Sequence, residues 1–259
     1  MNSVLKFAEI NIKELQQIKA NIKKFSPHPN QVKIAAVTKT FSLQAIQNAY
    51  KNNLWIIGEN KLQETIQKTK QFKKPKKLKI HFIGHLQKNK TKKAVKIYDV
   101  IQTVDSEKLA IKINNCAKQQ NKKQKIFIQI NISNNQRQTG IKKEEAMSLI
   151  KKTEEMKNIK TCGIMAIGPN TTNKTTTNTR YKEFYKLHLK IKEKHKNIKE
   201  LSIGMSGDYK LALKNGATII RLGTVLFGKR NEQGKTLFNK RGSIANSNIK
   251  ERPATKEIY

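Results

Sequence analysis

The chain has 259 residues, of which 36% are hydrophobic, so it can build a substantial core in one large domain or two small ones. Its formal net charge is +36, from 54 Lys and Arg against 18 Asp and Glu. Two cysteines outside any C-x-x-C pair exclude a disulfide scaffold, and no stretch approaches the ~18 apolar residues of a membrane span, so we predict a cytoplasmic protein.

The excess of positive charge raises the question of a polyanionic partner such as nucleic acid. Only six of the basic residues are Arg, the side chain that forms bidentate hydrogen bonds with bases and phosphates. The lysines are spread from Lys6 to Lys256 and occur with many Asn and Ile, which indicates a general bias of composition. We therefore expect no specific nucleic-acid partner, and a basic nucleic-acid-binding protein remains an alternative supported by charge alone.

An amphipathic helix is predicted first, because apolar residues recur at helical spacing between Val4 and Lys24 before Ser26-Pro27 breaks the pattern. Eight short apolar runs follow, most of them separated by helical patterns. The runs are Val32–Thr38, Leu54–Gly58, Leu78–Gly84, Val100–Val104, Ile126–Ile132, Thr161–Ile167, Leu201–Gly204 and Thr218–Gly223. Strands that alternate with helices predict parallel pairing with right-handed crossovers.

Eight such units predict a single-domain α/β fold, the (β/α)8 or TIM barrel. An open doubly wound sheet is the rival, but it usually carries a glycine-rich loop after its first strand, and the segment 38–41 is not one. We expect the barrel domain to occupy residues 1–230, with the N-terminal helix within 1–25. A polar tail is expected over 231–259. The Thr- and Asn-rich segment 170–179 is predicted to be a mobile loop after the sixth strand.

Candidate functional residues follow the strands, because the active site of such a barrel lies at the C-terminal strand ends. Lys39 comes directly after the first strand and is either a solvent-exposed amine or a nucleophile toward an aldehyde. Gly204-Met205-Ser206-Gly207 and Gly223-Thr224 follow strands seven and eight, where such barrels bind phosphate through backbone N–H groups. Strands one and eight are neighbours in a closed barrel, so this arrangement suits a phosphorylated aldehyde.

Arg221 interrupts the apolar eighth strand, and a buried cation needs a partner. That partner is either a structural carboxylate or the ring acceptor of a cofactor. Asn60 ends the second strand, where it is either a turn residue or a hydrogen-bond partner of a ring hydroxyl. His81 and His85 lie near the same face, and His81 can equally be a buried imidazole with a partner. The sequence contains no group of residues with metal-ligand spacing and no recognisable Ser-His-Asp set.

Eight segments together resemble a known family, the YggS/PROSC-type pyridoxal phosphate (PLP) homeostasis proteins. They are AAVTKTFS (35–42), IGENKLQE (57–64), HFIGHLQKNK (81–90), QTVDSEKLA (102–110), IFIQINIS (126–133), CGIMAIGP (162–169), LSIGMSGDYKLAL (201–213) and IIRLGTVLFGKR (219–230). Departures are small: Thr38 stands where serine is common, His85 where proline is common, and 207–208 where two acidic residues are common.

The resemblance implies a barrel of the alanine racemase type (PLP fold type III) that holds PLP as an internal aldimine on Lys39. It implies phosphate contacts from the loop and turn after strands seven and eight, and Arg221 facing the pyridine nitrogen. The implied phosphate contacts are Met205, Ser206, Gly223 and Thr224. It also implies a non-catalytic role in PLP homeostasis, buffering PLP or delivering it to recipient apoenzymes.

A PLP-dependent amino-acid racemase that uses the same lysine is the alternative. Racemisation needs two bases, one on each face of the substrate adduct. Lys39 can serve one face, whereas in true alanine racemases the second base is a tyrosine from an extra β-domain, for which this chain has no room. None of its tyrosines carries a motif. We therefore expect a binding protein rather than an enzyme, and a monomer.

Overall fold

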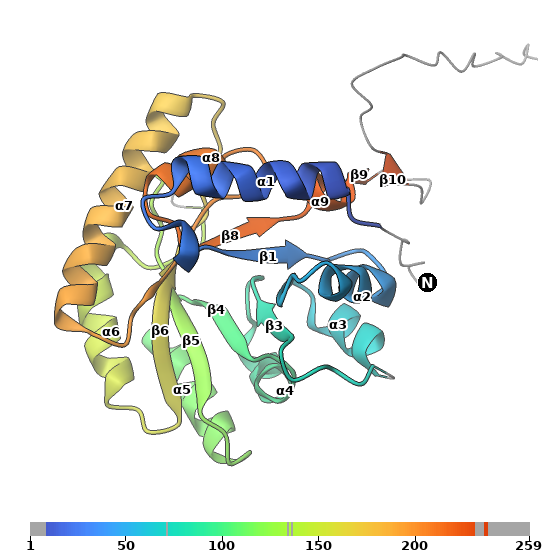
Figure 1. The fold of residues 1–259 in the computed structure, drawn as a ribbon. Helices are drawn as coiled ribbons and strands as arrows, with labels where there is room; N and C mark the ends of the chain where they lie inside the picture. Colours follow the sequence, from blue (N-terminus) through green and yellow to red (C-terminus); the bar gives the residue numbers. More distant parts are fainter. Residues whose placement is uncertain (1–8, 71, 134, 136, 231–235, 238–259) are drawn as a thin grey trace, which may run out of the picture.

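Eight strands close into a barrel in which every neighbouring pair is parallel (Figure 1). The computed structural model describes residues 9–70, 72–133, 135, 137–230 and 236–237. The strands are β1 (Lys33–Val37), β2 (Ile56–Glu59), β3 (Lys79–Phe82), β4 (Val100–Val104), β5 (Gln124–Gln129), β6 (Ile159–Met165), β7 (Glu200–Ser202) and β8 (Ile219–Leu222). The predicted barrel is confirmed, and the predicted strand bounds differ from these by three residues at most.

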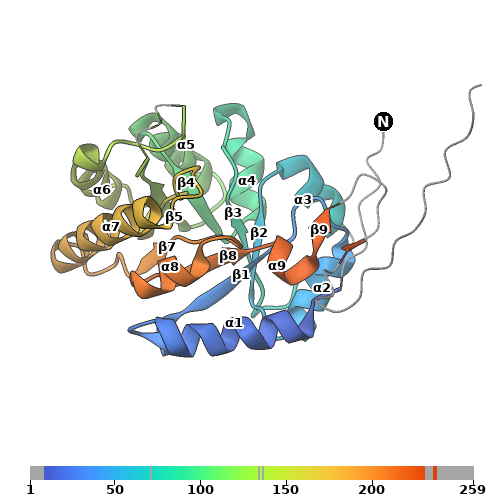
Figure 2. The same cartoon turned by 90° about the horizontal axis from the view of Figure 1, so that it is seen from above.

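Helices surround the barrel, as Figure 2 shows from above. They are α1 (Ile12–Phe25), α2 (Leu43–Lys51), α3 (Leu62–Thr69), α4 (Thr91–Ile97), α5 (Glu107–Lys118), α6 (Ala146–Glu154), α7 (Lys174–Lys194), α8 (Tyr209–Lys214) and α9 (Thr224–Phe227). Short 3-10 turns lie at Pro29–Gln31, Lys88–Lys90 and Lys143–Glu145. A two-stranded pair, β9 (Lys229–Arg230) and β10 (Thr236–Leu237), lies outside the barrel.

The N-terminal helix α1 begins at Ile12, because the side chain of Asn11 caps it by accepting a hydrogen bond from the N–H of Glu14. Its apolar stripe, which includes Leu15 and Ile18, is buried, and the helix packs against α8 and α9. Of the predicted helix, residues 4–8 lie outside the described part of the chain.

The prediction of a loop over 170–179 is wrong for its second half, since α7 begins at Lys174. Asn173 caps this helix through a 3.1 Å bond from the N–H of Thr176, and Thr177 and Tyr181 are buried. A cap and tertiary packing therefore override the low helix propensity of the Thr- and Asn-rich run. The predicted tail, 231–259, lies outside the described residues except for 236–237.

The apolar core has two parts, which follow from the alternation of side chains along each strand. Residues pointing outward pack against the helices, and residues pointing inward fill the barrel. The inner cluster comprises Ala35, Ile56, Val100, Phe127, Met165 and Ile219. Within the described ranges, no helix has the length and apolar character to cross a membrane.

Candidate functional site

The seam where the barrel closes brings the first and the last strand together. Ala35 pairs with Arg221 and Ala36 with Leu222, so both strands end at the same rim of the barrel. Lys39 lies half-buried in the turn that follows β1. The pairing of β1 with β8 therefore places Lys39 near the turn that follows β8, as the closed barrel predicted.

The loops after β7 and β8 are joined by one hydroxyl. Ser206 Oγ accepts hydrogen bonds from the backbone N–H groups of Gly223 and Val225, each at 3.3 Å. Gly204 has a φ of +89°, and a Cβ there would lie 2.5 Å from the Cβ of Ala212, so this turn requires glycine. The two segments predicted to cradle phosphate are thus in direct contact.

Met205 and Thr224, the other two residues predicted at this position, are exposed at the rim. The N–H of Met205 donates to Asp208 Oδ1 at 2.6 Å, and Asp208 Oδ2 accepts from the hydroxyl of Tyr181 at 2.7 Å. Asp208 therefore fixes the loop after β7 to helix α7. This role of Asp208 was not predicted from the sequence.

Arg221 is only 4% exposed and is held by oxygens of β7 and of the end of β6. Its guanidinium donates to the carbonyl and the hydroxyl of Ser202 and to the carbonyl of Ala166, each at 2.8 Å. Burial lowers the pKa of Arg221, although the group keeps its proton near neutral pH. Of the two partners considered, a structural carboxylate is not found: among the described residues Arg221 makes no ion pair.

A chain of hydrogen bonds continues from Arg221 across the barrel interior. The hydroxyl of Ser202 donates to Gln102 Oε1 at 2.7 Å, and Gln102 Nε2 lies 2.7 Å from His81 Nδ1. Burial lowers the pKa of His81 to about 3, so the imidazole is neutral. His81 is therefore a buried imidazole with a partner, whereas His85 is exposed.

Asn60 follows β2 and is half-buried. Its Oδ1 is buried and has no hydrogen-bond partner within the described part of the chain. Its backbone oxygen lies 2.3 Å from the position that a Cβ on Gly84 would take, so β2 and β3 approach closely here only because residue 84 is glycine. The side chain of Asn60 thus offers an unused acceptor at the same rim.

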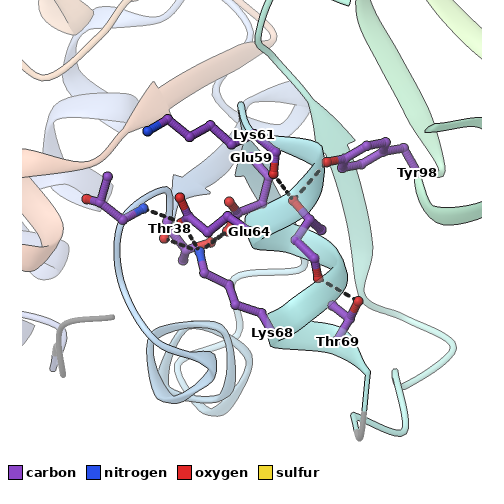
Figure 3. Close-up of polar contacts among 9 residues, drawn as sticks. Thr38, Glu59, Lys61, Glu64, Lys68, Thr69 and Tyr98 are labelled. Atoms are coloured by element: carbon purple, nitrogen blue, oxygen red, sulfur yellow. Dashed lines mark hydrogen bonds and ion pairs between the residues drawn. The ribbon is translucent and has the colours of Figure 1, made fainter. Parts of the chain in front are cut away.

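Beneath the turn that carries Lys39 lies a buried cluster of three charged side chains, Glu59, Glu64 and Lys68, drawn in Figure 3. The ammonium of Lys68 contacts Glu59 at 2.8 Å and Glu64 at 2.6 Å, and its side chain has 0% exposure. Burial raises the pKa of Glu59, while the ammonium of Lys68 opposes that rise.

This cluster was not predicted from the sequence, although both carboxylates lie in the segment 57–64. The available signal was the spacing of Glu64 and Lys68, four residues apart on one helix directly after a strand that ends in Glu59. In a chain with this many lysines, such a pair does not stand out from surface charge.

Cavities lie at both ends of the barrel. One of about 1090 Å³ is at the N-terminal strand ends and includes Lys33, Lys79 and Lys125 in its lining. Two smaller ones, of about 730 and 600 Å³, lie at the C-terminal ends, the first reaching Asn60 and the second Met205. Chemistry in this fold belongs to the C-terminal ends, so size does not identify the candidate site.

Comparisons with known proteins match the chain over most of its length. The family model of the alanine racemase N-terminal domain matches residues 14–231. A pyridoxal phosphate homeostasis protein of Haemophilus influenzae is 35% identical over 219 residues, which is 83% of this chain and 92% of that protein. One from a Synechocystis species is also 35% identical, over 78% of this chain and 93% of its own length.

Solved structures agree with these matches. PipY of Synechococcus elongatus, solved with PLP bound and without it, superimposes with TM-scores of 0.74 and 0.76 at 28% identity, over 83% of this chain and 99% of PipY. Alanine racemase of Clostridium difficile gives a TM-score of 0.69 at 19% identity over 86% of this chain and 58% of the racemase, which is a likeness of fold alone. The chain belongs to the pyridoxal phosphate homeostasis protein family, which is built on the alanine racemase N-terminal domain.

Proposed function

We propose that this protein binds PLP through a covalent bond to Lys39 and serves PLP homeostasis by buffering the cofactor or delivering it. The observation that carries the proposal is the contact between the loops after β7 and β8, where Ser206 Oγ meets the N–H groups of Gly223 and Val225. Backbone N–H groups and a hydroxyl at this position are suited to a phosphate group.

The other residues of the rim fit the remaining parts of PLP. The unused Oδ1 of Asn60 suits a ring hydroxyl, which needs an acceptor. Arg221, fixed by three hydrogen bonds, suits the ring nitrogen, because an arginine can only donate. Met205 and Thr224 at the exposed edge of the phosphate cradle complete the set.

When bound, PLP supplies an electrophilic aldehyde and a ring that withdraws electrons from atoms attached to it. Arg221 bears on the second property, since a guanidinium that keeps its own proton leaves the ring nitrogen unprotonated. An unprotonated ring withdraws electrons weakly. Carbanion chemistry on bound PLP would therefore receive less help from the ring.

Two of the tyrosines, Tyr181 and Tyr209, also favour a binding role over the racemase alternative. The hydroxyl of Tyr181 donates to Asp208, and the hydroxyl of Tyr209 accepts from Asn21 at 2.8 Å. Both side chains are buried, and burial raises the pKa of each, which makes deprotonation harder. Neither is a base poised at the rim. The names of the relatives, which are homeostasis proteins, support the same choice.

Three finer points belong to the proposal. Recipient apoenzymes are the expected partners in delivery, the protein is expected to be a monomer, and a cytoplasmic location suits the unpaired thiols of Cys116 and Cys162. No specific nucleic-acid partner is expected, so any binding of nucleic acid should be weak and should vanish near physiological salt.

The experiment that tests the proposal compares the wild type with Lys39→Ala and a matched control, Lys61→Ala, which removes an exposed lysine near the same rim. Each protein is mixed with PLP, its visible spectrum is recorded, and borohydride is added before peptide mapping. We expect a visible band in the wild type and control, abolished by borohydride with the label on Lys39. Absence of that label from wild-type Lys39 would overturn the proposal.

An assay for loss of optical activity in L-alanine separates the carrier from the racemase. We expect no turnover above the background of free PLP. Turnover by the wild type that disappears in Lys39→Ala would refute the non-catalytic role, while leaving PLP binding intact.

A further inference from the structure

We propose that the cluster of Glu59, Glu64 and Lys68 is a clamp that positions Lys39 for its reaction with the aldehyde of PLP. The inference rests on the proposed function, because it assigns a role to residues that support Lys39. The residues of the clamp touch neither the phosphate cradle nor Arg221 through any hydrogen bond of the described residues.

The ammonium of Lys68 is held by three oxygens from different segments. It donates hydrogen bonds to the backbone carbonyl of Thr38 and to Glu59 Oε1, each at 2.8 Å, and it forms an ion pair with Glu64 Oε1 at 2.6 Å. These contacts hold the buried ammonium in place. Lys68 therefore ties helix α3 to the end of β2 and to the turn after β1 at one point (Figure 3).

The contacts of the clamp fall on both neighbours of Lys39. Thr38 is held twice, because its carbonyl accepts from Lys68 and its hydroxyl donates to Glu59 Oε1. Thr40 is held through its N–H, which donates to Glu64 Oε1. Anchors on residues 38 and 40 fix the backbone of residue 39 from both sides, so they fix where its side chain starts.

The backbone of Thr40 shows that the turn needs such support. Its φ is +68°, a left-handed conformation that is unusual for a β-branched residue and costs about 1–3 kcal/mol. Such a conformation persists only where surrounding contacts impose it. The N–H of Thr40 donates to Glu64, and the hydroxyl of Thr40 has no hydrogen-bond partner among the described residues.

Stability alone does not account for the clamp. Three charged groups are taken out of water, and apolar side chains of similar size commonly stabilise a core as well or better. Glu59 Oε2 is buried and has no partner within the described ranges, which adds a cost without a compensating contact. The contacts converge on residues 38–40 instead, which points to placement of Lys39.

The reaction that benefits is the condensation of the Lys39 amine with the aldehyde of PLP. The Lys39 amine attacks the aldehyde carbon, a C=N bond forms, and the carbonyl oxygen leaves as water with the two amine protons. Its rate depends on where the nitrogen sits relative to an aldehyde whose phosphate is already bound. A misplacement of about 1 Å costs about 100-fold in such reactions.

The test uses a matched pair at Glu64, which is at the edge of the cluster and 8% exposed. Glu64→Ala removes the acceptor for the N–H of Thr40 and the ion pair with Lys68, whereas Glu64→Gln removes the same charge but keeps an oxygen acceptor. The apo-protein is mixed with PLP, and the rate at which the visible band appears is measured. We expect Glu64→Ala to react about 10- to 100-fold more slowly, and Glu64→Gln to recover most of the rate.

A second readout separates positioning from general damage. Pyridoxine 5′-phosphate has the ring and the phosphate of PLP but no aldehyde, so its affinity reports the pocket without the reaction. We expect its Kd to stay within about twofold of the wild-type value in both variants, because the phosphate cradle is intact. Borohydride trapping and peptide mapping then show whether Lys39 still takes the label.

The outcomes are distinguishable. No adduct at Lys39 of the wild type refutes the proposed function itself. If the wild type forms the adduct and Glu64→Ala forms it at the same rate, the clamp is refuted and the proposed function stands. The same conclusion follows if both variants lose affinity for pyridoxine 5′-phosphate to the same extent as they lose rate. If Glu64→Ala does not fold, Thr38→Val replaces it: the variant lacks only the hydroxyl that donates to Glu59, and an unchanged rate there refutes the clamp.

Discussion

Replacing Lys68 with Met removes a cation from a place that water does not reach. The side chain has 0% exposure, as does that of Glu59, so solvent screens little of the interaction between them. Losing one partner of a buried ion pair costs about 3–5 kcal/mol, because the other charge is left uncompensated. We expect Lys68→Met to lower the free energy of unfolding by about that amount at pH 7.5.

The size of this loss should depend on pH in a definite direction. Burial raises the pKa of Glu59 above its ordinary value of 4.5, and removing Lys68 raises that pKa further. A carboxyl whose pKa is raised in the folded state destabilises the fold once it ionises. That penalty disappears as the pH falls toward the pKa that the carboxyl has in the unfolded chain. The deficit of Lys68→Met should therefore shrink between pH 7.5 and about pH 5.

Urea unfolding at the two pH values measures both effects, with Lys61→Met as the control. Lys61 is the exposed residue just before α3, so its replacement should change stability by no more than about 0.5 kcal/mol. A deficit for Lys68→Met below about 1 kcal/mol at pH 7.5, or one that grows as the pH falls, would refute the account of the cluster as a buried, paired network.

Two further predictions concern the rim and the barrel interior. In Gly84→Ala the new Cβ would lie 2.3 Å from the backbone oxygen of Asn60. We therefore expect the variant to lower the free energy of unfolding by about 1–3 kcal/mol in the same urea assay and to form the adduct with PLP more slowly. A variant with the stability and the rate of the wild type would contradict this. His81, whose pKa burial lowers to about 3, stays neutral in the fold while the unfolded chain takes up a proton below about pH 6.5. Stability should therefore fall as the pH drops below 6.5, and His81→Gln should flatten that part of the profile measured by thermal unfolding; an unchanged profile would refute the assignment.

The alternation of apolar and helical segments was enough to predict the barrel, and barrel closure was enough to predict that Lys39 and the turn at Gly223 lie at neighbouring strand ends. Those inferences depend only on strand order. The partners of Arg221 could not be predicted, because they are carbonyls and a hydroxyl on other strands, and such groups leave no mark in the residue pattern. The start of α7 was missed for a related reason: packing of Tyr181 outweighed the polar run before it.

The cluster of Glu59, Glu64 and Lys68 could not be predicted from the sequence either. Glu59, Glu64 and Lys68 meet only because the end of a strand, the next helix and the turn after the preceding strand converge. Local spacing indicates the pair on the helix, but not that both side chains are buried. The roles of the individual rim residues in holding PLP stay predictions that the experiments above address.

The seam between β1 and β8 has a consequence for the chain as it is made on the ribosome. Residues 38–40 are synthesised early, but the strand that closes the barrel beside them, with the hydroxyl and N–H groups of 206 and 223–225, is among the last described parts to emerge. A nascent chain that stops short of β8 contains Lys39 but lacks the contact between the loops after β7 and β8. Under the proposed function, PLP would therefore be captured only after the barrel has closed, and PLP on Lys39 would mark a molecule in which β1 and β8 have already paired.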